Sequence, residues 1–125
     1  MKPIASQGQF SSRFILIEAT MATTSLSEVV DAQGLTLVGF EMPANSTATS
    51  LKIQELPRFA SSTPIVLKDQ SGADIAIAVA SGASIARFSP LIFPTVGQIR
   101  VNVAAGTVPA GSVIGLLFIK PQGER

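Results

Sequence analysis

Short runs rich in Ile, Val, Leu, Phe and Thr recur about every ten residues along this chain, and Gly, Pro, Asn, Asp or Ser closes each run. Runs of this length and spacing are typical of antiparallel strands in a sandwich or barrel. The pattern predicts an all-β fold, an antiparallel and jelly-roll-like β-sandwich of about eight strands. The candidate strands, one of which we expect to be lost, are residues 13–20, 26–31, 35–42, 49–56, 64–68, 74–80, 84–89, 98–104 and 112–120.

The run at residues 26–31 has two interpretations. Ser25 and Glu28 have the spacing of a capping box, in which two side chains satisfy each other's free backbone donors at the start of a helix. One interpretation is therefore a single helical turn before Gly34. The apolar residues of the run also fit a strand, and we favour the strand while keeping both open.

Alternation of side chains divides several of the expected strands into two faces. Residues 75–79 place Ile and Val on one face and Ala76 and Ala78 on the other, while residues 99–103 place apolar side chains opposite Arg100 and Asn102. Because small side chains let a neighbouring chain approach closely, we predict that Ala76 and Ala78 lie at an interface. The run at residues 113–119 is apolar on both faces, which favours a central strand covered by this chain or by another subunit.

The segments outside the runs predict one hairpin and one arm. Residues 69–74 join two runs and include a Gly that can take a positive φ, which predicts a hairpin. Residues 1–12 are polar apart from Ile4 and Phe10 and predict an extended N-terminal arm, which leaves residues 13–125 as one β-sandwich domain. Phe59 and Phe93 lie between prolines in expected loops, so each is either a core residue or a partner contact. The candidate interface residues are Ile4, Phe10, Phe59, Ala76, Ala78 and Phe93.

The composition counts against reaction chemistry. The chain has no His, Cys, Trp or Tyr, and its eight carboxylates are scattered singly. Since His and Cys are the usual proton shuttles, thiol nucleophiles and soft metal ligands, we predict no enzyme activity, no cofactor and no metal site. Ser50 and Lys52 share a strand face, but their spacing does not specify a nucleophile and its base.

The number and distribution of charged residues indicate which kinds of partner this chain can bind. Nine Lys and Arg residues are spread singly, with a net charge of +1, so there is no basic stripe for nucleic acid. No apolar run approaches the ~20 residues that span a membrane. Only 14% of the residues are charged, whereas 46% are hydrophobic. A single folded chain of this composition would leave apolar surface exposed, which predicts a protein partner.

Residues 22–121 resemble, in layout, a family of small β-sandwich structural proteins of tailed bacteriophages. The resemblance is carried by residues 23–30 (TTSLSEVV), 35–43 (LTLVGFEMP), 48–54 (ATSLKIQ), 89–93 (SPLIF) and 98–101 (QIRV), before the closing apolar strand. It implies a noncatalytic virion protein that decorates or cements the capsid by binding the major capsid protein as a homo-oligomer, often a trimer. It also implies a location on the capsid surface after assembly in the host cytoplasm.

An alternative function is a tail-associated or fibre-associated module that recognises host-surface carbohydrate. The lack of Trp and Tyr counts against this alternative, because large aromatic side chains are the usual platforms for sugar rings.

Overall fold

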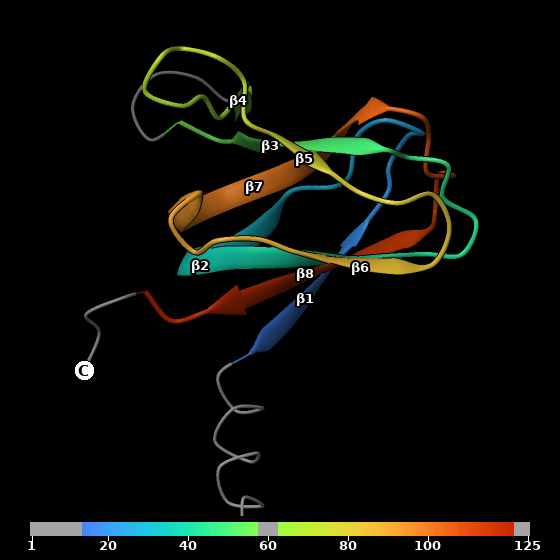
Figure 1. Cartoon of the computed structure of the whole chain (residues 1–125), viewed down its shortest axis with the longest axis horizontal. Helices are drawn as coiled ribbons and strands as arrows, with labels where there is room; N and C mark the ends of the chain where they lie inside the picture. The colour runs from blue at the N-terminus through green and yellow to red at the C-terminus, as the bar shows by residue number, and fades with distance from the viewer. Residues whose placement is uncertain (1–13, 58–62, 122–125) are drawn as a thin grey trace, which may run out of the picture.

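The computed structural model of this protein describes residues 14–57 and 63–121. This part of the chain is all-β, with eight strands and no helix (Figure 1). All strand pairs are antiparallel, as the spacing of the runs predicts. The strands are β1 (Ile15–Thr20), β2 (Val30–Met42), β3 (Ser50–Glu55), β4 (Ile65–Val66), β5 (Ala76–Ala78), β6 (Ser84–Arg87), β7 (Phe93–Ala105) and β8 (Val113–Ile119).

The strands form two layers that share the long strand β2 (Figure 1). The first layer has the order β1-β8-β2-β6, in which the second half of β2 pairs with β8 and β6. The second layer has the order β2-β7-β3, in which the first half of β2 pairs with β7, and β3 also pairs with β4 and β5. Hydrogen bonds therefore join all eight strands into one sheet that folds over itself.

This connectivity is that of a jelly roll. The strand pairs are nested in the order of the sequence. The outermost pair is β1 with β8, the next is the first half of β2 with β7, and the third is the second half of β2 with β6. The innermost pair is β3 with β4 and β5. Nested pairing of this kind rolls a long hairpin into two sheets whose apolar faces close on each other. The predicted antiparallel, jelly-roll-like sandwich is confirmed.

An irregularity inside β2 joins residues 30 and 31, the end of one expected strand, to the strand expected at residues 35–42. The side chain of Asp31 accepts a hydrogen bond from the N–H of Gln33 at 2.9 Å, and both Gln33 and Gly34 have a positive φ. The register against β7 shifts between Asp31 and Leu35. Extra residues of this kind bend a strand, which here lets β2 pass from the second layer into the first.

The run at residues 26–31 forms neither a helical turn nor a full strand, since only Val30 and Asp31 belong to β2 and Leu26 and Ser27 make isolated bridges. The helical alternative is wrong, because Ser25 and Ser27 bond to β7 instead. The carbonyl of Ser25 accepts the N–H of Val103 at 2.7 Å, and the N–H of Ser27 donates to the carbonyl of Val101 at 3.0 Å. The hydroxyl of Ser27 accepts the N–H of Val101 at 2.9 Å. A capping box offers two local hydrogen bonds, and pairing along a distant strand replaces them.

The core lies between the two layers and includes most of the aromatic side chains described. Phe88 packs against Phe40 and Phe93, with ring centroids 5.4 Å and 5.7 Å apart. Phe93 begins β7, pairs with Leu37 and is only 1% exposed. The structure therefore corrects the expectation of a loop at Phe93 and places its side chain in the core, which excludes it as a surface contact of this fold.

Two strands are shorter than predicted, and the turn between them is as predicted. The runs at residues 64–68 and 74–80 yield only β4 and β5, and β3 is the one strand that pairs with them within residues 14–57 and 63–121. Between them, the N–H of Asp69 donates to the carbonyl of Ala73 at 2.9 Å, and Gly72 has a φ of 89°. The predicted hairpin is confirmed.

Candidate functional site

The outer surface of the first layer is a mixed but mainly apolar sheet face. The register places its side chains opposite the core row formed by Ile17, Leu116, Phe40 and Ala86. Apolar and glycine positions outnumber charged ones on this surface. We call it the β1–β6 face, and it consists of the row Leu16, Leu117, Gly39 and Arg87, the row Glu18, Gly115, Glu41 and Ile85, and the pair Thr20 and Val113. Of its apolar side chains, Leu117 is only 7% exposed.

Large apolar side chains of the β1–β6 face are open to solvent. Leu16 and Ile85 are 50% and 61% exposed. Gly39 and Gly115 have no side chain, so neighbouring leucines pack directly onto the backbone in the middle of the face. A Cβ on Gly39 would lie 3.2 Å from a methyl carbon of Leu117, and a Cβ on Gly115 would lie 3.0 Å from a methyl carbon of Leu16. Leucine side chains lie over backbone here, and such a low apolar surface suits contact with another protein surface.

A cation–π contact spans the β1–β6 face. The guanidinium carbon of Arg87 lies 5.1 Å from the centroid of the Phe14 ring. Arg87 belongs to β6 and Phe14 precedes β1, so the two side chains come from opposite edges of the layer. The contact orders Arg87 across the sheet and adds roughly 0.5–1 kcal/mol at an exposed site.

The outer surface of the second layer is polar. Lys52 and Gln54 of β3 lie opposite Asn102 and Arg100 of β7, and Arg100 Nε donates to Gln54 Oε1 at 2.6 Å. We call these four residues the polar face. The predicted interface residues Ala76 and Ala78 are exposed on β5 at the edge of this surface, opposite Lys52 and Ser50. Their role at an interface stays a prediction.

Asp74 holds two lysines beside the polar face. Its carboxylate accepts a hydrogen bond from Lys52 Nζ at 3.0 Å and another from Lys68 Nζ. The hydrogen bonds from Lys68 and Lys52 lower the pKa of Asp74. Lys52, which shares a face with Ser50, is thus engaged in a structural ion pair.

Replacing Asp74 with asparagine is expected to make folding less sensitive to acid. The pKa of Asp74 in the folded state lies below its usual value of 3.8, so the ionised carboxylate stabilises the fold at any pH above 3.8. This stabilisation is lost as the pH falls through the lower pKa of the folded state. The stability advantage of the wild type over Asp74→Asn should therefore shrink from about pH 5 to about pH 2. Urea unfolding at each pH measures the difference, and a gap that does not change with pH would contradict the prediction.

Of the three predicted interface residues that the structure describes, Ala76 and Ala78 lie together on β5 and Phe93 lies apart from them in the core. Ile4, Phe10 and Phe59 lie outside the described residues. The residues that sequence reasoning missed are Leu16 and Ile85. Alternation placed them on the face opposite Ile17 and Ala86, but both faces of these runs carry apolar side chains, so the pattern did not tell which face is outside.

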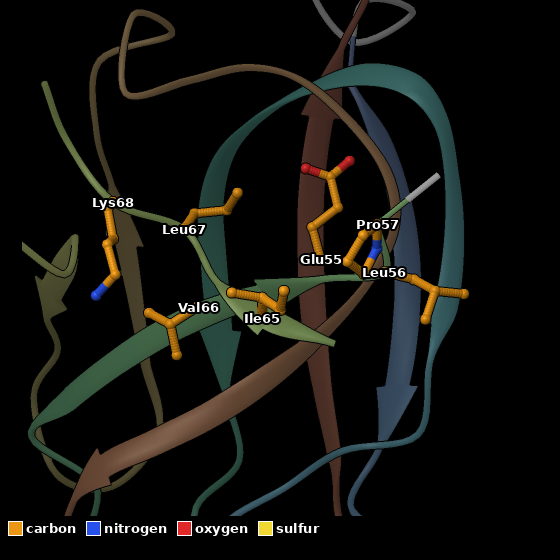
Figure 2. Close-up of a pocket in the computed structure, with 7 residues that line it drawn as sticks. All are labelled: Glu55, Leu56, Pro57, Ile65, Val66, Leu67 and Lys68. Atoms are coloured by element: carbon orange, nitrogen blue, oxygen red, sulfur yellow. The ribbon is translucent and has the colours of Figure 1, made fainter. Parts of the chain in front are cut away.

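A cleft of about 440 Å³ lies beside the end of β3 (Figure 2). Its lining combines apolar side chains with one acid and one base, and comprises Glu55, Leu56, Pro57, Ile65, Val66, Leu67 and Lys68. Glu55 Oε2 accepts the N–H of Gly97 at 2.7 Å, and Lys68 pairs with Asp74. Both charged groups therefore already hold strands or turns together.

Within residues 14–57 and 63–121, no group of three or more carboxylates comes together to hold a metal ion. The same residues contain no helix that is long and apolar enough to cross a membrane. No protein-family model, curated protein or solved structure matches this chain. The chemistry of the two outer faces is therefore the basis for inferring a function.

Proposed function

We propose that this chain is a noncatalytic structural protein of a tailed-phage virion, which decorates or cements the capsid by binding the major capsid protein as a homo-oligomer. The observation that carries the proposal is the β1–β6 face, a sheet surface with exposed Leu16 and Ile85 around two glycines. A trimer is the assembly order that the resemblance to phage structural proteins implies.

The energetics of the β1–β6 face favour a partner. Burying apolar area contributes about 25 cal/mol per Å², so covering a large aliphatic side chain stabilises a complex by about 1.5–3 kcal/mol. The charged members Glu18, Glu41 and Arg87 lie among the apolar ones, and they would set the orientation of the partner.

The fold agrees with this proposal by analogy alone. Jelly rolls occur in viral capsid domains and also in lectins, so the architecture fits a virion protein without specifying one.

The experiment that tests the proposal is co-sedimentation with capsids assembled from the major capsid protein of the same phage. Ile85→Ser should weaken binding roughly tenfold to a hundredfold, because a covered isoleucine is worth about 1.5–3 kcal/mol. Ile65→Ser is the matched control, since Ile65 is 55% exposed but belongs to β4 in the other layer. Both variants should keep their folding stability within about 0.5 kcal/mol. A wild-type protein that stays in the supernatant, or equal binding by the two variants, would refute the proposal.

The second candidate function is recognition of host-surface carbohydrate by a tail-associated or fibre-associated module. The observation that favours it is the polar face, where amide and cationic side chains stand in adjacent rows and can donate to sugar hydroxyls. A glycan array probed with the full chain tests this function. Binding that Arg100→Ala removes would support it, and an array with no bound glycan would end it.

A further inference from the structure

The strand β1 lies at one end of the hydrogen-bonded order, and none of the other described strands pairs with its outer edge. The N–H of Met21 donates to the carbonyl of Ser112, and the N–H of Gly111 donates to the carbonyl of Met21, both at 2.8 Å. With a φ of 87° at Gly111, this is a glycine bulge that fixes which residues of β1 bond to β8.

From Met21 the hydrogen-bonding alternates backwards along β1. Ala19, Ile17 and Ile15 direct their N–H and C=O groups to β8, so Leu16 and Glu18 direct theirs to the open side. The carbonyl of Thr20 already accepts the N–H of Glu28 at 2.8 Å. No other described segment bonds to the backbone of Leu16 or Glu18, so the N–H and C=O groups of both residues remain open to a further strand.

The core is incompletely covered along the same edge. Ile15 and Ile17 point inward and pack against the core, yet both are only partly buried. A further strand beside β1 would pair the free backbone groups and also cover these two isoleucines. The edge therefore has both hydrogen-bonding and hydrophobic reasons to take a partner strand.

We infer that β1 pairs antiparallel with β1 of a second copy of this chain, about a two-fold axis at Ile17. In this register Leu16 of each copy faces Glu18 of the other in the hydrogen-bonded positions, and the two Ile17 side chains meet in the non-hydrogen-bonded position between them. A register centred on Glu18 would instead set two carboxylates opposite each other, which is unfavourable.

The strand β6, at the other end of the first layer, would be a less favourable partner for the β1 edge than a second β1. The inward positions of β6 are Ser84 and Ala86, which gain little from a covering strand. Arg87 of β6 is already drawn across the sheet onto Phe14, so its charge is not directed toward Glu18 of a neighbour. A two-fold contact also needs only one self-complementary surface, which is the commonest form of homo-oligomer.

The inference rests on the proposed function for one point, that copies of this chain associate with each other. The strand through which they associate is inferred from the β1 edge itself. It leads to dimers, or to larger assemblies with an even number of chains, in place of the trimer that the resemblance implies. The β1–β6 face then runs on across the two-fold axis from one copy to the next, which doubles the apolar surface offered to a capsid.

Single cysteine variants of the full chain test the pairing cleanly, because the protein has no cysteine of its own. Under mild oxidation Ile17→Cys should form a disulfide-linked dimer, since Cα atoms at a non-hydrogen-bonded pair lie about 4.5 Å apart, within disulfide reach. Glu18→Cys alone should not link, because the two copies of this residue would be diagonal neighbours, about 7–8 Å apart. Equal amounts of Leu16→Cys and Glu18→Cys should link to each other.

Light scattering after size exclusion supplies the second measurement. The wild type should have the mass of a dimer or of an even-numbered assembly, and Glu18→Pro should halve a dimer mass while circular dichroism stays that of the folded protein, since the N–H of Glu18 bonds to no described residue. A trimer, a monomer, or failure of Ile17→Cys to link more than Glu18→Cys would overturn the pairing. Capsid binding lost on Ile85→Ser would still support the proposed function, so the two failures are distinguishable.

Discussion

Gly106→Ala is expected to destabilise the protein by about 2–5 kcal/mol, the combined cost of left-handed strain and overpacking. Gly106 follows β7 with a φ of 80°, and a Cβ there would lie 2.7 Å from the carbonyl carbon of Thr47 and 2.8 Å from the Cα of Ala48. These are backbone atoms, so no side chain can turn aside to make room. Urea unfolding measures the loss as a lower midpoint with an unchanged slope.

The position is crowded because two loops are tied together there. The N–H of Thr47 donates to the carbonyl of Thr107 at 2.9 Å, and the N–H of Thr107 donates to the hydroxyl of Thr47 at 3.0 Å. The matched control is Gly111→Ala, since Gly111 has a similar φ of 87° but no atom within 4 Å of an added Cβ. It should cost only the backbone strain, about 1–2 kcal/mol. Equal losses for the two variants would show that the crowding at Gly106 is unimportant.

Phe118→Ala is expected to cost about 3–5 kcal/mol, the usual loss when a large core aromatic is truncated. Phe118 is fully buried in β8, opposite Ile15 of β1 and Leu37 of β2. Its ring therefore lies where three strands of the first layer meet, and those strands cannot all move in to fill the cavity. Since domains are stable by only about 5–15 kcal/mol, this variant should be close to unfolding at room temperature.

Leu91→Ala is the control for this second experiment. Leu91 is 80% exposed, so its truncation should change the free energy of unfolding by no more than about 0.5 kcal/mol. Both variants are compared with the wild type by urea unfolding followed by circular dichroism. A loss below about 1 kcal/mol for Phe118→Ala would mean that β8 is not the centre of the core, and the jelly-roll register would then need revision.

The strands themselves were predictable because alternation and turn chemistry are local. The hairpin at residues 69–74 follows from a Gly that takes a positive φ and from neighbouring apolar runs, and it forms as expected. The run at residues 113–119, apolar on both faces, correctly indicated a strand in the middle of a layer, since β8 lies between β1 and β2.

The errors occur where a distant strand decides a local structure. Ser25 and Glu28 match a capping box, yet Ser25 and Ser27 bond to β7, because strand pairing satisfies more backbone groups than the box does. Phe93 lies between two prolines, which favours a loop, yet it pairs with Leu37 and buries its ring against Phe88. Neither outcome is contained in the local residues, because the partner lies more than fifty positions away in the chain.

For the candidate site too, one part was predictable from the sequence and another part depended on the tertiary structure. The sequence by itself determined an all-β chain with alternating faces and too few charges to cover it, since side-chain period and composition need no knowledge of contacts. Only the tertiary structure decided that Leu16 and Ile85 face outward and that β1 ends a layer. The physical reason is that pairing joins segments from opposite ends of the chain, such as Thr20 and Val113, and this pairing selects which apolar face becomes core and which stays open.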